Sequence, residues 1–317
     1  MKSDPKRTIT SRASSISRAV DEIGDKWCLF ILEEVFWGVN TFNELQSSTG
    51  ASRGVLNDRL KWLQHIKCLR KEAPSSSPKR PVYHLTKKSI DLYDSGLMAI
   101  GWERKYFTMP ELDQVELIHN RCGKSFWPVI NCILCDGDID FSEVFYRQGI
   151  GANKDTRQIK TRRRSSVPML EPNPARPAYR NLINLVGDRW TANVIALSFH
   201  RITRFDEFHK ELPIATNILA DRLKFLVNQG VFFKRPYRKG PIRYEYKLTD
   251  KGKDLYPYFL TLLQWGNRWC GTGAPDPMIL SHGPCGSDLV GEVRCDQCGE
   301  KLVATDVHFK YSPENLL

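Results

Sequence analysis

The chain of 317 residues repeats its own sequence at a constant spacing of 163 residues. The residues GDKW at 24–27 return as GDRW at 187–190, and DRL at 58–60 returns at 221–223. Because the spacing holds without a net gap to the last cysteines of each copy, it indicates a tandem duplication. The fold therefore consists of two copies of one smaller structure, and a chain of this length also favours two domains or more.

Residues 13–148 form repeat 1 and residues 176–311 form repeat 2. In repeat 1, residues 26–37 are apolar on nearly every side and predict a buried helix. Thr41 and Glu44 have the spacing of a capping box, which marks the start of a short helix. Ser52 is placed to cap a longer helix that reaches residue 66. The apolar positions of this helix and of its counterpart in repeat 2 recur at helical spacing at Leu56, Leu60 and Leu63, and at Leu219, Leu223 and Leu226.

A strand–turn–strand pattern follows in both repeats, and its turns are rich in Pro, Ser and Gly, which suits a hairpin. The predicted strands lie at residues 69–71, 82–85, 231–234 and 244–248. The window 234–243 holds five basic residues and no acidic one. Thr86 and Thr249 then open a final helix. Helices, a turn, a longer helix, a hairpin and a closing helix make the order of a winged helix-turn-helix, an α+β fold.

Four motifs in this order make the chain similar to the HxlR-type family of bacterial transcription regulators. They are the Gly-Asp-Lys/Arg-Trp start, the Phe-x-Glu-Leu/Phe short helix, the Leu-x-Asp-Arg-Leu-x-x-Leu helix and the Tyr-x-Leu-Thr strand end. The resemblance spans residues 14–106 and 177–269. It implies a winged helix-turn-helix that works as a dimer on DNA, with recognition helices at 52–66 and 215–229. Several family members sense oxidants through a cysteine before the first helix, and this chain has Ser14 or Pro177 there.

The exposed residues of these helices and hairpins are the predicted DNA contacts. Arg and Asn side chains can pair bidentately with guanine and adenine, so Arg53, Asn57, Thr216 and Asn217 are expected to contact bases. Hairpin Lys and Arg side chains neutralise phosphates. The full predicted set is Ser52, Arg53, Asn57, Lys61, Lys79, Arg80, Thr216, Asn217, Lys224, Arg238, Lys239 and Arg243. Two other interpretations stay open, namely that these charges are only solvated or that the domains bind proteins.

A second motif, His-x2-Cys-x9-Cys-x2-Cys, follows the helix-turn-helix region in both repeats. Its residues are His119, Cys122, Cys132 and Cys135, and His282, Cys285, Cys295 and Cys298. Two ligand pairs joined by a short loop meet the needs of a tetrahedral Zn²⁺ site, so we expect one structural ion in each repeat. Gly123, Gly286 and Gly299 directly follow ligand pairs and allow tight turns there.

Buried free thiols or a disulfide are the alternatives for these cysteines, and Cys28, Cys68 and Cys270 are assigned to core packing. Four protein ligands leave no open position on the metal, so the site is not expected to be catalytic. The sequence contains no nucleophile elbow, no phosphate-binding glycine loop and no carboxylate pair in a convincing context. The chain is therefore not expected to be an enzyme.

These patterns divide the chain into five parts. The predicted parts are a winged helix-turn-helix at 13–110, a zinc-ribbon-like module at 111–148, a basic linker at 149–175, a second winged helix-turn-helix at 176–273 and a second module at 274–311. The linker is rich in Gly, Pro, Ser and Arg without apolar periodicity, which indicates a solvated connection. Its basic run at 160–164 suits either a nucleic-acid backbone or a merely soluble linker.

Charge and hydropathy limit the classes of partner that this chain is expected to bind. The chain has 47 Lys and Arg against 36 Asp and Glu, a formal net charge of +11 that favours a polyanion. It has no apolar run of about 18 residues and no signal-like amino terminus, so we expect a cytoplasmic, nucleoid-associated protein without a membrane partner.

The sequence therefore predicts a regulator that binds specific double-stranded DNA, in which one chain supplies both halves of a pseudo-dimer. A zinc-stabilised scaffold for protein interactions is the alternative. The operator, the target genes, the choice of repression or activation, any small-molecule or redox effector and further association of chains are left open.

Overall fold

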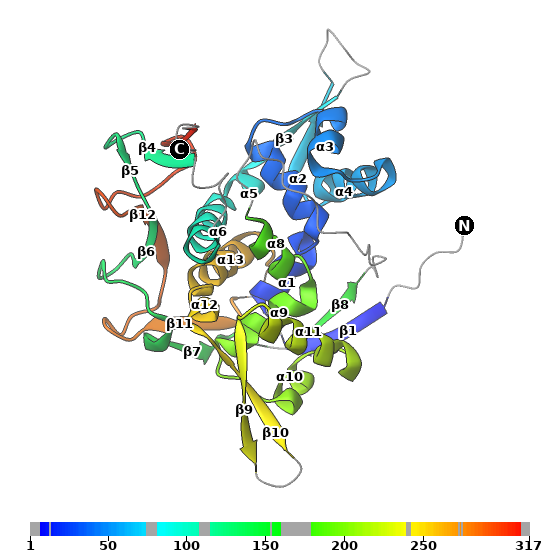
Figure 1. Cartoon of the computed structure of the whole chain (residues 1–317), viewed down its shortest axis with the longest axis vertical. Coiled ribbons are helices and arrows are strands. Elements are labelled where there is room, and N and C mark those ends of the chain that lie inside the picture. The colour runs from blue at the N-terminus through cyan, green and yellow to red at the C-terminus, as the bar shows by residue number, and fades with distance from the viewer. Residues whose placement is uncertain are drawn as a thin grey trace, which may run out of the picture. The chain divides into compact units, whose positions relative to one another are not determined.

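The computed structural model of the chain describes residues 7–12, 14–73, 81–107, 115–152, 154–159, 179–238, 242–271, 273 and 275–311. Apart from one two-residue strand and one 3-10 helix that the described residues form in repeat 1 alone, both repeats fold into the same order of helices and strands (Figure 1). Repeat 1 contains α1 (Ser15–Ile23), α2 (Lys26–Phe36), α3 (Phe42–Thr49), α4 (Arg53–His65), β2 (Leu69–Glu72), β3 (Val82–Leu85), α5 (Lys87–Ile90), α6 (Tyr93–Tyr106), β4 (Val115–His119), β5 (Lys124–Ser125), β6 (Pro128–Cys132), the 3-10 helix η1 (Phe141–Glu143) and β7 (Val144–Gln148).

Repeat 2 contains α8 (Arg180–Val186), α9 (Arg189–Ser198), α10 (Phe205–Glu211), α11 (Thr216–Asn228), β9 (Phe232–Arg238), β10 (Arg243–Leu248), α12 (Asp250–Lys253), α13 (Tyr256–Trp269), β11 (Met278–His282), β12 (Gly291–Cys295) and β13 (Val307–Tyr311). Outside the repeats, β1 (Arg7–Arg12) pairs antiparallel with β8 (Lys154–Ile159). The strand β8 lies in the segment 149–175, which was predicted to be a solvated linker. Its backbone pairing with β1 has no counterpart in the local sequence pattern.

The predicted caps and core stripes are confirmed. Glu44 N–H donates to Thr41 Oγ1 at 3.4 Å and Thr41 N–H donates to the Glu44 carboxylate at 3.3 Å, so the capping box forms. Ser52 caps α4 by accepting from Val55 N–H at 3.4 Å. The leucines of both recognition-helix stripes are at most 1 % exposed, which places them in the core at Leu56, Leu60, Leu63, Leu219, Leu223 and Leu226.

The closing helix of each repeat is broken, where the sequence predicted one continuous helix. In repeat 1, α5 ends at Ile90, which is 42 % exposed, and α6 begins at Tyr93. In repeat 2, α12 ends at Lys253 and α13 begins at Tyr256 with a proline in its first turn. Pro257 has no N–H to donate, so it fits the first turn of a new helix and not the interior of a longer one.

The chain groups into two compact units, and neither unit coincides with a repeat. Unit 1 consists of Met1–Asp21, Cys132–Met169 and Asp188–Gly291, and unit 2 consists of Glu22–Asn131, Leu170–Gly187 and Glu292–Leu317. Each unit therefore contains the helix-turn-helix body of one repeat together with the first helix and some strands of the other repeat. The two repeats exchange equivalent segments.

In unit 2, the exchanged helix α8 packs on α2 and α6 of repeat 1. The Glu103 carboxylate on α6 accepts hydrogen bonds from Asn181 N–H at 3.0 Å, Leu182 N–H at 3.1 Å and Asn181 Nδ2 at 2.6 Å. These backbone groups belong to the first turn of α8 and have no partner within the helix, and a negative charge is favoured there. Glu103 is fully buried, so the end of α8 is held inside the unit.

In unit 1, the exchanged helix α1 is held by different side chains. Asp21 forms an ion pair with Arg189 at 2.8 Å, and the Ser17 hydroxyl donates to the Asn193 side-chain oxygen. The backbones of α1 and α13 approach so closely that a Cβ atom at Gly266 would lie 2.4 Å from the Ser15 carbonyl oxygen. Only glycine fits at that contact.

The strands after each helical body are exchanged in the same way. The strand β4 of repeat 1 pairs antiparallel with β13 of repeat 2, and β11 of repeat 2 pairs antiparallel with β7 of repeat 1. The spacing of 163 residues converts one of these pairs into the other. The strand β6 of repeat 1 also pairs with its own counterpart, β12 of repeat 2. Each of these pairings therefore joins a strand of repeat 1 to a strand of repeat 2.

An aspartate–arginine pair holds each recognition helix against the preceding helix. Asp25 caps α2 and accepts two hydrogen bonds from Arg59 of α4, at 2.7 and 3.0 Å. Asp188 caps α9 and accepts two from Arg222 of α11, at 2.7 and 2.9 Å. The aspartate of the repeated Gly-Asp motif thus both starts one helix and orients the next.

Among the described helices, none is long and apolar enough to cross a membrane.

We expect Asp188→Asn to lower the free energy of unfolding at pH 7 by about 1–2 kcal/mol, because it weakens a bidentate charged pair that is partly shielded from water. Burial raises the pKa of Asp188, but the hydrogen bonds and charge of Arg222 outweigh burial and leave the pKa lowered. Stability from this group is present above the unfolded pKa of about 3.9 and is lost as pH falls through the lower folded pKa.

Urea unfolding of the native protein and of Asp188→Asn at several pH values checks this expectation. The difference between the two should shrink below about pH 4. The exposed neighbour Asp221 provides the control, and Asp221→Asn should leave stability almost unchanged. A difference that persists unchanged to pH 3 would contradict the assignment.

Candidate metal centres and nucleic-acid interface

Each pair of predicted metal ligands begins at the last residue of a strand. The strands β4, β6, β11 and β12 end at His119, Cys132, His282 and Cys295. After each, the chain turns so that an N–H four residues later donates to the carbonyl of the strand end, over 2.7 to 2.9 Å. The turn brings the second ligand of the pair back beside the first. These second ligands are Cys122, Cys135, Cys285 and Cys298.

The residue that closes each turn has a left-handed backbone. The φ angle is 69° at Gly123, 69° at Gly286 and 74° at Gly299, as the glycines in the sequence predict. The fourth turn uses Asp136 with φ of 57°, which the sequence analysis missed. Aspartate is one of the few other residues that adopt this conformation readily.

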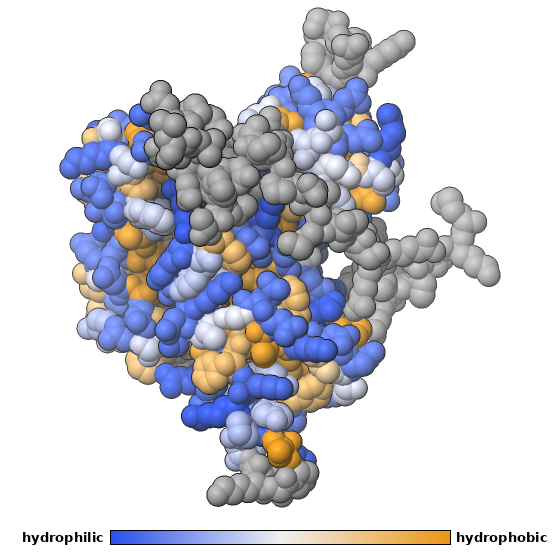
Figure 2. All heavy atoms as spheres, viewed as in Figure 1, coloured by the Kyte–Doolittle hydropathy of each residue, from blue (hydrophilic) through white to orange (hydrophobic). Residues whose placement is uncertain are grey.

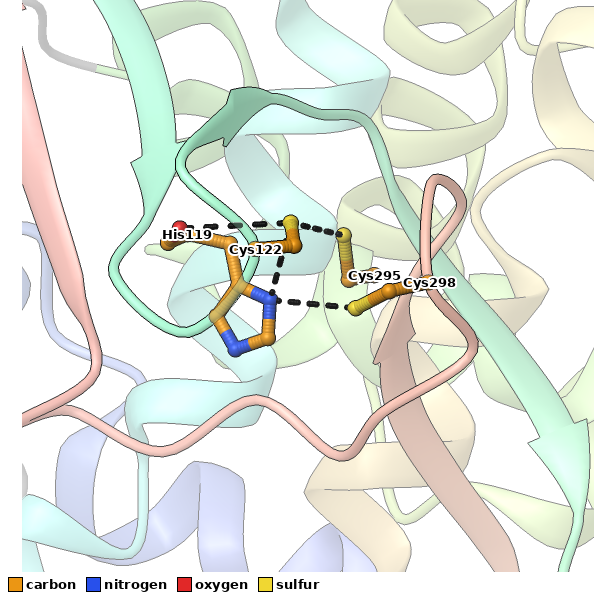
Figure 3. Close-up of side chains that lie close together, drawn as sticks. All are labelled: His119, Cys122, Cys295 and Cys298. Atoms are coloured by element: carbon orange, nitrogen blue, oxygen red, sulfur yellow. Dashed lines mark hydrogen bonds between the residues drawn. The ribbon is translucent and has the colours of Figure 1, made fainter.

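The cluster in unit 2 consists of His119, Cys122, Cys295 and Cys298. Figure 3 shows the four side chains pointing toward one another, with Cys295 and Cys298 on the C-terminal segment. The His119 Nδ1 atom lies 3.5 Å from Cys122 Sγ and 3.3 Å from Cys298 Sγ, and Cys122 Sγ lies 4.0 Å from Cys295 Sγ. The Nε2 atom of His119 is buried without a hydrogen-bond partner among the described residues.

The cluster in unit 1 consists of Cys132, Cys135, His282 and Cys285. The His282 Nδ1 atom lies 3.3 Å from Cys135 Sγ and 3.5 Å from Cys285 Sγ. On the other side of the ring, Nε2 lies 3.2 Å from the Asp138 carbonyl oxygen. A proton on Nε2 donated to this carbonyl leaves the Nδ1 lone pair directed at the thiols, which is how histidine ligands are oriented in metal sites.

The expected pairing of ligands within one repeat does not occur. The structure pairs His119 and Cys122 of repeat 1 with Cys295 and Cys298 of repeat 2, and it completes the other cluster in the reciprocal way. The reason is the strand exchange, because β6 ends beside β11 and β12 ends beside β4 only when strands of both repeats pair. The module limits at 111–148 and 274–311 therefore do not enclose complete clusters.

The surroundings of the thiols differ in their effect on protonation. The N–H of Ser287 donates to Cys285 and lowers the pKa of this thiol to about 6, and the N–H of Lys124 lowers the pKa of Cys122. Burial raises the pKa of Cys295 to about 11 and the pKa of Cys68, outside the clusters, to about 12. Metal ligands must be thiolates, so the donated N–H groups favour the binding form at the turns.

Each cluster could hold one metal ion. All ligand atoms of a cluster lie within 4.8 Å of one another. Zn–S and Zn–N bond lengths give a tetrahedron with edges of about 3.8 Å between sulfurs and about 3.6 Å between sulfur and nitrogen. The distances of 4.0, 3.5 and 3.3 Å in the unit 2 cluster are close to these edges. None of the nine cysteines, all within the described residues, forms a disulfide, and Cys28, Cys68 and Cys270 lie outside both clusters.

The predicted DNA contacts of α4 lie on its exposed side, opposite the leucine stripe. Arg53, Asn57 and Lys61 are exposed, as is the capping residue Ser52. The guanidinium of Arg53 lies 5.3 Å from the ring centre of Phe42 on α3, which restrains its direction. Over α4, at the upper right of the view, Figure 2 shows mainly hydrophilic residues.

The corresponding surface of α11 carries different side chains. Thr216, Asn217 and Lys224 are exposed there. At the spacing of 163 residues, Arg53 of α4 corresponds to Thr216 of α11, and Asn57 corresponds to Ala220. The two helices therefore offer unequal surfaces. Of the predicted DNA contacts, only the lysine, at 61 and 224, is common to both helices.

The hairpins carry the remaining predictions. Arg243 is exposed on β10, opposite the backbone of Arg238 on β9. Lys79, Arg80 and Lys239, and the side chain of Arg238, lie outside the described residues.

Two further basic residues of this hairpin, which the sequence analysis did not single out, are exposed. The Nζ atom of Lys234 lies 4.8 Å from the ring centre of Tyr244, and Arg235 pairs with Glu245 at 2.6 Å. The sequence feature that could have pointed to these two residues is the basic window at 234–243.

The chain matches the model of one protein family, the HxlR-like helix-turn-helix, at residues 22–111 and again at 185–274. Rv3095 of Mycobacterium tuberculosis (strain ATCC 25618 / H37Rv), an uncharacterized HTH-type transcriptional regulator, is 35 % identical over 125 residues, which are 39 % of this chain and 79 % of that protein. YvaP of Bacillus subtilis (strain 168), another such regulator, is 32 % identical over 105 residues, which are 33 % of this chain and 93 % of YvaP.

Among solved structures, the crystal structure of PA1607 is 34 % identical with a TM-score of 0.39, and the match covers 43 % of this chain and 94 % of that one. The Rv3095 match covers 39 % of this chain but 79 % of that regulator, so Rv3095 is about half as long, the length of one repeat. The two family matches together cover more than half of the sequence. This protein therefore belongs to the HxlR-like helix-turn-helix family of transcription regulators and carries the domain of that family twice.

Proposed function

We propose that this protein regulates transcription as an intramolecular pseudo-dimer on double-stranded DNA. Its two recognition helices, α4 and α11, enter the major groove, and its basic hairpins contact the sugar–phosphate backbone. The observation that carries the proposal is the exchange of equivalent segments between two helix-turn-helix bodies.

The exchange favours joint action of the repeats. Removing α8 from unit 2 would leave the buried Glu103 carboxylate without its N–H donors, and removing α1 from unit 1 would uncover the backbone beside Gly266. Separating the two repeats would also leave β4 and β11 without their partner strands. Because equivalent elements are exchanged reciprocally, the single chain reproduces the logic of a domain-swapped dimer.

The roles of individual residues follow from their chemistry and exposure. Arg53 and Asn57 are suited to guanine and adenine, and Asn217 to adenine, while Lys61 and Lys224 are suited to phosphates. Arg243 supports backbone contact from β10. Ser52, Thr216, Lys79, Arg80, Arg238 and Lys239 complete the proposed interface.

Selection from random duplexes should yield an operator with unequal half-sites, because α4 and α11 expose different side chains. A triple variant, Arg53→Thr with Gly54→Asn and Asn57→Ala, gives α4 the surface of α11. A Cβ atom at Gly54 meets nothing within 4 Å, so the helix accepts the change. The variant should select a more symmetric site. A symmetric site selected by the native protein would contradict the assignment.

Binding should depend steeply on salt, because proposed contacts to roughly 6–10 phosphates imply a loss of about 10³–10⁵ in affinity between 50 and 200 mM salt. Lys61→Ala and Lys224→Ala should each reduce the slope of log K against log[salt] by about 1. Lys301→Ala removes the same charge beside Glu292, outside the recognition helices and hairpins of the proposed interface, and should leave the slope unchanged. A flat salt response, with charge reversal of Arg238 and Lys239 tolerated, would favour the protein-interaction scaffold instead.

The proposed metal is zinc, one structural ion in each cluster. Three thiolates and one imidazole at tetrahedral spacing are a donor set typical of structural Zn²⁺. Since ligands come from both repeats, each ion would link one repeat to the other and stabilise the exchanged strands. All four positions would be occupied by protein, which leaves no site for catalysis.

Two double variants distinguish this cross-repeat arrangement from closed modules. Cys122→Ser with Cys295→Ser alters one cluster only, so about one zinc ion per chain should remain. Cys122→Ser with Cys132→Ser alters both clusters, so zinc should fall to nearly zero. The measurement is metal content per folded chain after dialysis against a weak chelator. Ligand pairing within each repeat would give the opposite pair of results.

A further inference from the structure

The two cysteine–histidine clusters have the same ligand types, but the outer nitrogens of their histidines have different surroundings. His119 and His282 are both 0 % exposed, so water does not reach either ring. A histidine that binds a metal through Nδ1 keeps its proton on Nε2, and this N–H needs an acceptor when it is buried. The partner of Nε2 therefore influences how firmly each histidine can hold an ion.

In the unit 1 cluster, this acceptor is present. The Nε2 atom of His282 lies 3.2 Å from the Asp138 carbonyl oxygen. The preceding residue, Gly137, favours this close approach, because a Cβ atom there would lie 3.3 Å from Cys135 Sγ and 3.6 Å from His282 Cε1. The carbonyl thus fixes both the tautomer and the direction of the His282 ring.

In the unit 2 cluster, the described residues supply no such acceptor. Figure 3 shows Nδ1 of His119 facing the thiols and Nε2 directed away from them. The Nε2 atom is buried without a hydrogen-bond partner, and the ring packs edge-on against Phe126, with the ring centres 6.1 Å apart. A metal bound by His119 Nδ1 would therefore leave a buried N–H unpaired, which is unfavourable.

The sequence offers a reason for this difference. At the spacing of 163 residues, Gly137 corresponds to Glu300 and Asp138 corresponds to Lys301. Glu300 has a Cβ atom where Gly137 leaves room beside the ligands, and the Lys301 carbonyl forms no hydrogen bond with His119 Nε2. The residue without a side chain is thus a feature of the unit 1 cluster alone.

The unit 2 cluster is connected to the helix-turn-helix body of repeat 1. The strand β4, which ends at His119, pairs with β13. Phe309 of β13 packs on Trp37, the C-cap of α2, with ring centres 4.2 Å apart. Since α2 packs on the recognition helix α4, an ion at this cluster would stabilise strands that support that body.

We propose that the two clusters hold zinc with unequal affinity and that the unit 2 cluster is the weaker, exchangeable site. The inference rests on the proposed zinc binding and adds an order of release. A partner that orients a histidine ligand typically changes metal affinity by about 10–100-fold. There is then a range of free zinc in which the chain keeps the ion of unit 1 and lacks that of unit 2. In this range, the packing of β13 on repeat 1 responds to zinc.

Competition between a chromogenic chelator and the full chain loaded with zinc measures both affinities. We expect two steps of release, separated by about 10–100-fold in dissociation constant. The variant Cys122→Ser with Cys295→Ser keeps only the unit 1 cluster and should show the tighter step alone. Cys135→Ser with Cys285→Ser keeps only the unit 2 cluster and should show the weaker step alone.

A matched pair of single substitutions tests the cause. Gly137→Ala places a Cβ atom 3.3 Å from Cys135 Sγ, so it should weaken the tighter step by about tenfold and leave the weaker step unchanged. Glu300→Ala changes the equivalent residue of unit 2 but keeps its Cβ atom, and it should leave both steps unchanged.

Release of both ions in a single step would overturn the order of release, and so would the tighter step remaining in the variant that lacks the unit 1 cluster. These results would leave the proposed zinc sites in place. A chain that binds no zinc would refute the metal centres and this inference together. DNA binding is not part of the measurement, so its failure would be recognised separately.

Discussion

Each cysteine–histidine cluster takes two of its residues from repeat 1 and two from repeat 2, and this sharing constrains the whole structure. The residues of one cluster lie at the ends of β4 and β12, and those of the other at the ends of β6 and β11, so strands of both repeats meet at each cluster. The same exchange places α1 and α8 in the unit that contains the other repeat's helix-turn-helix body. In a single chain, the linker makes the exchange intramolecular, so it does not depend on protein concentration.

The repeats keep the same backbone but differ in the side chains that hold their exchanged helices. Glu103 caps α8 in unit 2, and its counterpart is Gly266, where α1 approaches the backbone of α13 directly. Neither contact could be transferred to the other unit, because a carboxylate at position 266 would overlap Ser15. The two copies therefore differ at these inner contacts as well as on the exposed surfaces of α4 and α11.

The aspartate–arginine pairs separate stability from recognition on the same helix. Arg59 and Arg222 face inward to the caps Asp25 and Asp188, so these arginines are occupied by structural hydrogen bonds. The predicted DNA contacts on the outer side of α4 and α11 take no part in these aspartate–arginine pairs and remain exposed. The surface that would read DNA can therefore change without loss of the helix orientation.

Much of the fold could be predicted from local patterns. The capping box at Thr41, the cap at Ser52 and the leucine stripes of α4 and α11 depend on residues within a few positions of one another, and they form as predicted. The ligand turns are local in the same way, and Gly123, Gly286 and Gly299 adopt the positive φ that their position required.

The sequence by itself determined the duplication, the helix-turn-helix elements and the identity of the eight clustered Cys and His residues. Only the tertiary structure decided which ligand pairs meet, because equivalent pairs in the two repeats have the same spacing and either partner satisfies the local chemistry. Long-range strand pairing made that choice. Local spacing fixes a turn or a cap, whereas the partner of an exchanged strand depends on which surfaces are buried together.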